Sequence, residues 1–396
     1  MNVKKLIFLI LVLAGCQSGN KESRQEKELP VIDLSKNYPE RKIRLQDVAD
    51  IDFSPLETTD EVLMSGHSII FHVSDKYIFV YERLKGSVFI FHRNGKIFTH
   101  FNRMGQGGEE YIGITNASLI CDEKEEEIYV FGVDKISVYS LYGEFKRKFI
   151  PKNVVSIYKA HIFDDETLLV YFEDYDFSEK TNQYPYKLIS KKNGSIVHEF
   201  NIHLPVRYRN RIVRPIELDN GQMGQESSDI FISYNMQWGK DFVIADRSSD
   251  TIYRLTTNRE LTPILVRKPS VHSSEPRKVW NSFFTTDKFM LFQTNILDLK
   301  ALEDGKKGET VTFIYDFETG ETNKINFNDV ELERELWLPD LLSMYGTMPN
   351  NTTCKLLTVD YLKFFEDHKL LSGDLQKLVS SLDYEDNPVA IIYTFK

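Results

Sequence analysis

A row of arginines forms the most distinctive charge cluster in the 396-residue sequence. Arg207, Arg209 and Arg211 stand at a spacing of two within residues 205–215, Pro-Val-Arg-Tyr-Arg-Asn-Arg-Ile-Val-Arg-Pro. In an extended segment every second side chain points the same way, and guanidinium groups bind carboxylates and sulfates through paired hydrogen bonds. The spacing predicts an anion site in this connection, although solvated surface arginines without a ligand would leave the same pattern.

A second candidate is the glycine cluster Gly105, Gly107 and Gly108. A dinucleotide fingerprint would need its third glycine where Glu110 stands, and a phosphate-binding P-loop would need Gly-Lys-Ser or Gly-Lys-Thr. Strand-like runs flank the cluster on both sides. We therefore predict a link from an outer strand to the next inner strand, in which the glycines supply positive φ angles.

Metal-binding patterns are incomplete. Asp174, Asp176 and Ser178 begin a stretch that is similar to a calcium-binding loop. Such a loop needs glycine at its sixth position and glutamate at its twelfth, where this chain has Glu179 and Pro185. We interpret the stretch as a solvated acidic insertion that could hold an ion only loosely.

The nine histidines are scattered, without a His-Glu-x-x-His motif, and no serine stands in Gly-x-Ser-x-Gly. His72 and His161 lie in strand-like runs, where isolated histidines are more often core or channel lining than ligands. No catalytic residue, no metal ligand and no cofactor is predicted from these motifs.

The elements that must position these residues are strands, because short runs rich in aromatic and β-branched residues fill the chain. Similar units of four short strands start near Ser68, Ala117, Tyr158 and Asp229, and a fifth runs through residues 282–327. A recurrence of roughly 40 to 50 residues is typical of propeller blades. Hairpin turns are expected at Asn94-Gly95, Tyr142-Gly143, Asn193-Gly194 and Thr319-Gly320.

The ends of the chain are expected to complete a sixth blade. The strand-like segments 50–57 and 389–396 lie far apart in sequence, and pairing them would close the ring and remove open sheet edges. One short helix is predicted over 372–383, where apolar residues recur at helical spacing. The predicted fold is therefore an all-β, six-bladed β-propeller of four-stranded antiparallel blades, closed by its N- and C-terminal strands, with one short C-terminal helix packed on the last blade.

The composition limits the classes of partner and the number of disulfide bonds that are expected. The formal net charge of −10 would repel a phosphate backbone, so nucleic acid is not expected as a partner. Besides Cys16 the chain has only Cys121 and Cys354, too few for a disulfide framework. Both are expected to be buried small hydrophobes, and a single bridge between them is the lesser alternative.

The N-terminus has the features of an export signal. Lys4 and Lys5 precede a short apolar run, which ends in Leu-Ala-Gly-Cys at residues 13–16. This tetrad resembles the bacterial lipobox, in which the cysteine is acylated and becomes the first mature residue. We expect a signal peptide over 1–15, a lipid anchor at Cys16, a polar tether over 16–30 and the propeller over 31–396. An ordinary signal with a chance cysteine is the alternative.

The chain also resembles the six-bladed β-propeller lipoproteins common in Bacteroidetes, whose repeats are similar to NHL repeats. The similarity lies in residues 54–61, 93–111, 249–255 and 386–396. The family's blade link usually reads Gly-x-Gly-Pro-Gly-Glu-Tyr, whereas Gly108 and Glu109 replace its proline and third glycine here. The resemblance implies a cell-envelope protein, with the outer membrane as its expected site, facing the periplasm or the cell surface. It supplies no shared catalytic signature.

Two functions follow as hypotheses. The first is a membrane-anchored binding or scaffolding propeller that recruits an envelope protein or a glycan, in a context such as nutrient uptake. The second is a metal-assisted hydrolase or lyase, since some related propellers hold a metal in the central channel, and a divalent cation there is left open. We favour the first, because the sequence indicates an anchor and a ring, and expect the membrane as a partner through Cys16. The absence of a local motif does not exclude the second, because propeller sites are assembled from many blades.

Overall fold

The structure is a computed structural model that describes most of residues 29–396. It does not describe residues 113–118, 133–134, 152–156, 173–183, 203, 205, 207, 209–210, 218–221, 230–232, 235, 274–276, 298–309, 337 and 343–347. In residues 211–217, 224–229, 233–234, 281–282 and 339 only the backbone is described. Cys16 and the acidic insertion therefore lie outside the described residues.

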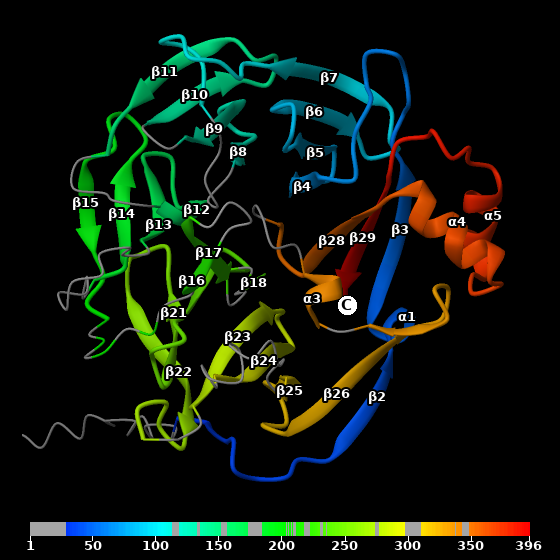
Figure 1. Ribbon diagram of the computed structural model, residues 1–396. Coiled ribbons are helices and arrows are strands. Elements are labelled where there is room, and N and C mark those ends of the chain that lie inside the picture. The colour runs from blue at the N-terminus through cyan, green and yellow to red at the C-terminus, as the bar shows by residue number, and fades with distance from the viewer. Residues whose placement is uncertain are drawn as a thin grey trace, which may run out of the picture.

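Antiparallel four-stranded meanders arranged as a ring dominate the fold (Figure 1). Blade 1 consists of β4 (Ser68–Val73), β5 (Tyr77–Glu82), β6 (Ser87–His92) and β7 (Ile97–Asn102). Blade 2 consists of β8 (Leu119–Asp122), β9 (Glu127–Phe131), β10 (Ile136–Ser140) and β11 (Phe145–Phe149). Blade 3 consists of β12 (Ile157–Ile162), β13 (Thr167–Phe172), β14 (Tyr186–Ser190) and β15 (Ile196–Glu199).

Blades 4 and 5 carry additional edge strands. Blade 4 consists of β19 (Gln237–Trp238), β20 (Asp241–Ala245), β21 (Thr251–Leu255) and β22 (Leu261–Lys268), with β1 (Val31–Asp33) parallel to β22. Blade 5 consists of β23 (Arg277–Thr285), β24 (Phe289–Leu297), β25 (Thr310–Asp316) and β26 (Thr322–Asp329). β18 (Ser233–Tyr234), β2 (Glu40–Arg44) and β27 (Arg334–Leu336) extend its edges, and β16 (Arg211–Glu217) pairs with β17 (Met223–Asp229) as a separate hairpin.

The two ends of the chain meet in a closing sheet of β28 (Thr352–Leu357), β29 (Val389–Phe395) and β3 (Ala49–Pro55). β29 is its middle strand and pairs antiparallel with β3 from Val389↔Pro55 to Phe395↔Ala49. Figure 1 shows this sheet between blade 5 and blade 1. The predicted pairing of the N- and C-terminal strands is confirmed.

The predicted number of blades is wrong. The structure has five four-stranded blades, and the described residues place only three strands in the closing sheet. The N-terminal segment that could have supplied a fourth, β2, pairs in parallel with β26 of blade 5 instead. The one-turn helix α1 (Leu45–Val48) then turns the chain from blade 5 into β3. The start of blade 4 is also later than predicted, since residues 233–234 pair with β23.

The helical prediction was incomplete. α5 (Gly373–Ser380) forms where expected and buries Leu375 and Val379, but the chain has a longer neighbour, α4 (Val359–Asp367), besides the one-turn helices α1 and α3 (Leu338–Leu341). The hydroxyl of Thr358 accepts a hydrogen bond from the backbone N–H of Tyr361 and so caps α4. Both helices pack with the closing sheet in one apolar cluster.

The hydrophobic core is divided among the interfaces between neighbouring sheets. Separate clusters join blade 1 to blade 2 and blade 2 to blade 3, and another joins the closing sheet to blade 1. In the last of these, Ile392 and Cys354 pack against blade 1. Cys121 and Cys354 are buried free thiols, as predicted. Because each blade buries both faces against neighbours, ring closure is a condition of core formation.

Candidate functional site

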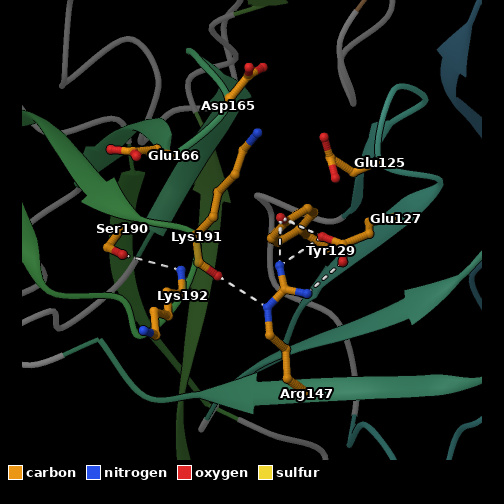
Figure 2. Close-up of a pocket in the computed structure, with 9 residues that line it drawn as sticks. All are labelled: Glu125, Glu127, Tyr129, Arg147, Asp165, Glu166, Ser190, Lys191 and Lys192. Atoms are coloured by element: carbon orange, nitrogen blue, oxygen red, sulfur yellow. Dashed lines mark hydrogen bonds and ion pairs between the residues drawn. The ribbon is translucent and has the colours of Figure 1, made fainter.

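Blades 2 and 3 enclose a polar groove of about 550 Å³ (Figure 2). Strand pairing explains its back wall, because Val138 of β10 pairs with Tyr129 on one side and with Arg147 on the other. Residues in register across a sheet point to the same face, so Tyr129 and Arg147 both face blade 3. The residues that line the groove are Glu125, Glu127, Tyr129, Arg147, Asp165, Glu166, Ser190, Lys191 and Lys192.

A closed hydrogen-bond network forms the back of the groove (Figure 2). Arg147 binds the Glu127 carboxylate in a bidentate manner, with Nη1–Oε1 at 2.5 Å and Nη2–Oε2 at 2.7 Å. The Tyr129 hydroxyl donates to Glu127 Oε2 at 2.8 Å and accepts from Arg147 Nη2 at 2.9 Å. Arg147 Nε donates to the carbonyl of Lys191 across the groove at 3.3 Å.

Charge sharing within this network sets the ionisation states. Burial acts to raise the pKa of Glu127, but the hydrogen bonds from Arg147 and Tyr129 outweigh it, so the pKa lies below its ordinary value. Burial and the Glu127 carboxylate raise the pKa of Tyr129. The network therefore holds an ionised carboxylate and a neutral phenol, both committed to internal partners.

Lys191, whose carbonyl accepts from Arg147, also forms a buried ion pair. Lys191 Nζ is 2.7 Å from Asp122 Oδ2, and the side chains are 6% and 7% exposed. Lys191 follows β14 of blade 3, and Asp122 ends the inner strand β8 of blade 2. The pair thus joins the two blades that form the groove.

Glu125, Glu166 and Lys192, which we call the rim residues, are exposed at the mouth of the groove. They lie on three separate turns, between β8 and β9, β12 and β13, and β14 and β15. Carboxylates accept hydrogen bonds and an ammonium group donates them, so the rim can bind a ligand that offers both donors and acceptors. Asp165 is committed to an exposed pair with Lys124 at 2.6 Å.

The predicted arginine site can be placed only in part. Arg207 and Arg209 lie outside the described residues, and Arg211 begins β16 with its backbone alone described. Tyr208 between them is described, and its N–H donates to Ser248 Oγ of blade 4 at 2.7 Å. The anion-binding role of the three arginines stays a prediction.

The two histidines are not brought together. His72 of β4 lies 2.9 Å from Glu123 Oε1, which links blade 1 to blade 2. His161 of β12 is buried, and its Nε2 has no hydrogen-bond partner. Burial, together with Lys159, lowers the pKa of His161 to about 3, so the ring is neutral. Among the described residues no group of three or more histidine, cysteine, aspartate or glutamate side chains is placed to hold a metal.

The glycine link has a different cause from the one predicted. None of Gly105, Gly107 and Gly108 has a positive φ angle. Instead the Glu110 carboxylate folds back on the backbone and accepts the Gly107 N–H at 2.7 Å. A Cβ on Gly105 would lie 2.1 Å from that carboxylate. The turn itself is confirmed, and it occupies the connection from β7 to the next blade.

Comparison with known proteins assigns the family. A family model described as Domain of unknown function (DUF4934) matches residues 29–394. The chain belongs to this family. None of the curated proteins compared with this DUF4934 chain matches it.

One solved structure shows a similar fold. The DUF4934 chain is similar to a protein of Bacteroides fragilis NCTC 9343 that is described as a presumed exported protein. The TM-score is 0.63 at 14% identity, over 93% of this chain and 99% of that one. A member of the DUF4221 family from Bacteroides vulgatus ATCC 8482 matches at a TM-score of 0.43 and 11% identity, over 88% and 97% of the chains. BamB from Moraxella catarrhalis matches at 0.35 and 10%, over 87% and 98%. The last two are too distant to carry an argument.

Sequence reasoning missed the groove. The acidic turn Asp122–Glu127 and the turn Asp164–Glu166 were visible as charged runs at the same place in successive units. That recurrence was the available signal. No helix within the described part of the chain has the length and apolar character needed to cross a bilayer.

Proposed function

We propose that the chain is a binding or scaffolding propeller of the bacterial cell envelope, which recruits a protein or a glycan through the groove between blades 2 and 3. This proposal rests on a difference among the groove side chains: some are hydrogen-bonded to one another, and others are exposed to solvent. Glu127, Tyr129 and Arg147 satisfy one another, whereas the rim residues Glu125, Glu166 and Lys192 are exposed around a cavity of about 550 Å³. Such a preorganised polar surface binds without paying for its own reorganisation.

The envelope part of the proposal has two supports. The N-terminal sequence has a charged start, a short apolar run and a Leu-Ala-Gly-Cys tetrad that ends at Cys16. The similar Bacteroides fragilis protein is described as a presumed exported protein. We propose that acylated Cys16 tethers the propeller to the membrane, in the outer membrane as the favoured place, and that the polar residues after it keep the groove accessible.

The test is affinity capture from a detergent-solubilised envelope fraction of the source bacterium. The rim variant carries Glu125→Gln, Glu166→Gln and Lys192→Gln, all on exposed side chains. The matched control carries Glu318→Gln, Glu321→Gln and Lys288→Gln, on exposed turns of blade 5. A protein or glycan retained by the wild-type and control proteins but lost from the rim variant supports the proposal. Equal retention by all three proteins contradicts it.

A further inference from the structure

A cluster of aromatic side chains lies on the other side of blade 2, at the position equivalent to the polar groove. Tyr77 is the first residue of β5 and pairs with His92, the last residue of β6. Glu127 is the first residue of β9 and pairs with Ser140, the last residue of β10. Tyr77 of blade 1 therefore occupies the place that Glu127 occupies in blade 2. One notch is built on an aromatic ring and the other on a carboxylate.

Four aromatic side chains in contact form this notch, which we call the aromatic notch. The ring centroids of Tyr77 and Phe98 are 5.0 Å apart, and His92 lies 5.6 Å from Tyr77 and 5.4 Å from Phe98. Tyr142 of blade 2 completes the set at 5.6 Å from Phe98. Tyr142 is 60% exposed and His92 is exposed, so the notch presents aromatic surface to solvent.

The aromatic notch and the polar groove lie on the same face of the ring. Tyr142 stands two residues after the last residue of β10, Ser140, and Lys192 stands two residues after the last residue of β14, Ser190. The two turns are therefore equivalent, one bearing an aromatic ring and the next a cation. In Figure 1 blades 1, 2 and 3 follow one another around the ring, so one extended ligand lying across blade 2 can reach both notches.

The chemistry of the two notches matches a carbohydrate chain. A pyranose ring has a flat face of C–H groups, which packs on the face of an aromatic ring. Its hydroxyl groups both donate and accept hydrogen bonds, and so suit a surface that carries carboxylates beside an ammonium group. Glu125, Glu166 and Lys192 carry charges of both signs, so they do not form a purely positive or purely negative surface that would favour a charged ligand.

We propose that the aromatic notch and the polar groove form one binding face for a neutral oligosaccharide. One sugar stacks on the exposed ring of Tyr142, beside Phe98, and a sugar further along the chain bonds to the rim residues Glu125, Glu166 and Lys192. This inference rests on the proposed function, and it selects a glycan over a protein as the ligand.

The test is isothermal titration of the purified protein with neutral hexasaccharides of glucose, mannose, xylose and galactose. Tyr142→Ala removes the exposed ring, and Tyr384→Ala removes a ring of similar exposure, 58% against 60%, from a loop outside both notches. Loss of a stacking contact should weaken binding by about 3- to 10-fold. The rim variant should bind the same hexasaccharide more weakly, and Tyr384→Ala should bind it with unchanged affinity.

The outcomes separate the inference from the proposed function. Weakening by both Tyr142→Ala and the rim variant supports one shared face. Binding that is insensitive to Tyr142→Ala overturns it, as does the absence of binding to every hexasaccharide at about 10 mM. If the envelope capture nevertheless finds a rim-dependent protein, the glycan inference fails while the proposed function stands. If the capture also finds nothing that depends on the rim, both fail.

Discussion

Replacing Lys191 by methionine removes the cation of a buried ion pair and leaves the carboxylate of Asp122 behind. The two groups are 2.7 Å apart and are 6% and 7% exposed. Breaking such a pair by removing one partner costs about 3–5 kcal/mol, because an uncompensated charge stays buried. Asp122 Oδ1 also accepts the N–H of Glu125, but at 3.3 Å this contact offsets little of the loss.

The control comes from the same pair of blades. Lys124 and Asp165 form a pair of similar length, 2.6 Å, whose side chains are 66% and 71% exposed. Solvent screens exposed pairs, which contribute little to stability, so Lys124→Met should leave the free energy of unfolding nearly unchanged. The two ion pairs are thus similar in length and differ in the burial of their side chains.

The assay is urea unfolding followed by tryptophan fluorescence and by circular dichroism. We expect a lower transition midpoint for Lys191→Met with an unchanged slope. The double variant Asp122→Leu/Lys191→Met should recover most of the loss, because a well-packed apolar pair can replace a buried ion pair. If Lys191→Met is as stable as Lys124→Met, the pair is solvated and the reasoning on its burial is refuted.

Three further predictions concern the pH response, ring closure and the anchor. Below pH 6.5 the unfolded chain protonates His161, whereas the folded chain keeps the ring neutral down to about pH 3, so lowering the pH through this window favours unfolding. His161→Leu removes this effect, and the free energy of unfolding should then fall by up to about 1.4 kcal/mol less for each pH unit. If it falls as steeply as in a control His67→Gln variant, the prediction is wrong. Ile392→Ala should cost about 2–5 kcal/mol in urea unfolding because its side chain is fully buried in the closing sheet, and an effect as small as that of the exposed Thr394→Ala would contradict the role of ring closure. Cys16→Ala should move the protein from the membrane to the soluble fraction in cell fractionation, and unchanged membrane association would exclude a lipid anchor at that residue.

Local patterns predicted much of the fold. The hairpin turns at Gly95, Gly143, Gly194 and Gly320 form as expected, and all four glycines have positive φ angles. At Gly143 a Cβ would also lie 2.4 Å from the ring of Phe101. Alternation and turn chemistry are encoded within a few residues, so the sequence alone reveals them.

Features that depend on distant partners could not be predicted in this way. β2 carries the polar sequence Glu-Arg-Lys-Ile-Arg, and nothing within it indicates that it pairs with β26. The missed helix α4 contains Tyr361, Phe364 and Phe365, aromatic residues that are also common in strands. Tertiary packing decided both cases.

The candidate site shows the same limit. Asp122 and Lys191 are 69 residues apart, and their contact follows from the geometry of adjacent blades rather than from any motif. Charged residues at turns are usual in soluble proteins, so Glu125 and Glu166 do not stand out singly, and only the recurrence of charged turns in successive units points to them. The arginine row attracted more notice because its spacing is local.

The most direct test of the groove as the binding face is hydrogen–deuterium exchange of the wild-type protein, alone and with the material captured from the envelope fraction. We expect slower exchange in the turns that line the groove, at residues 123–127, 164–167 and 190–195. Protection confined to the closing sheet and helices α4 and α5, with these turns unchanged, would contradict it.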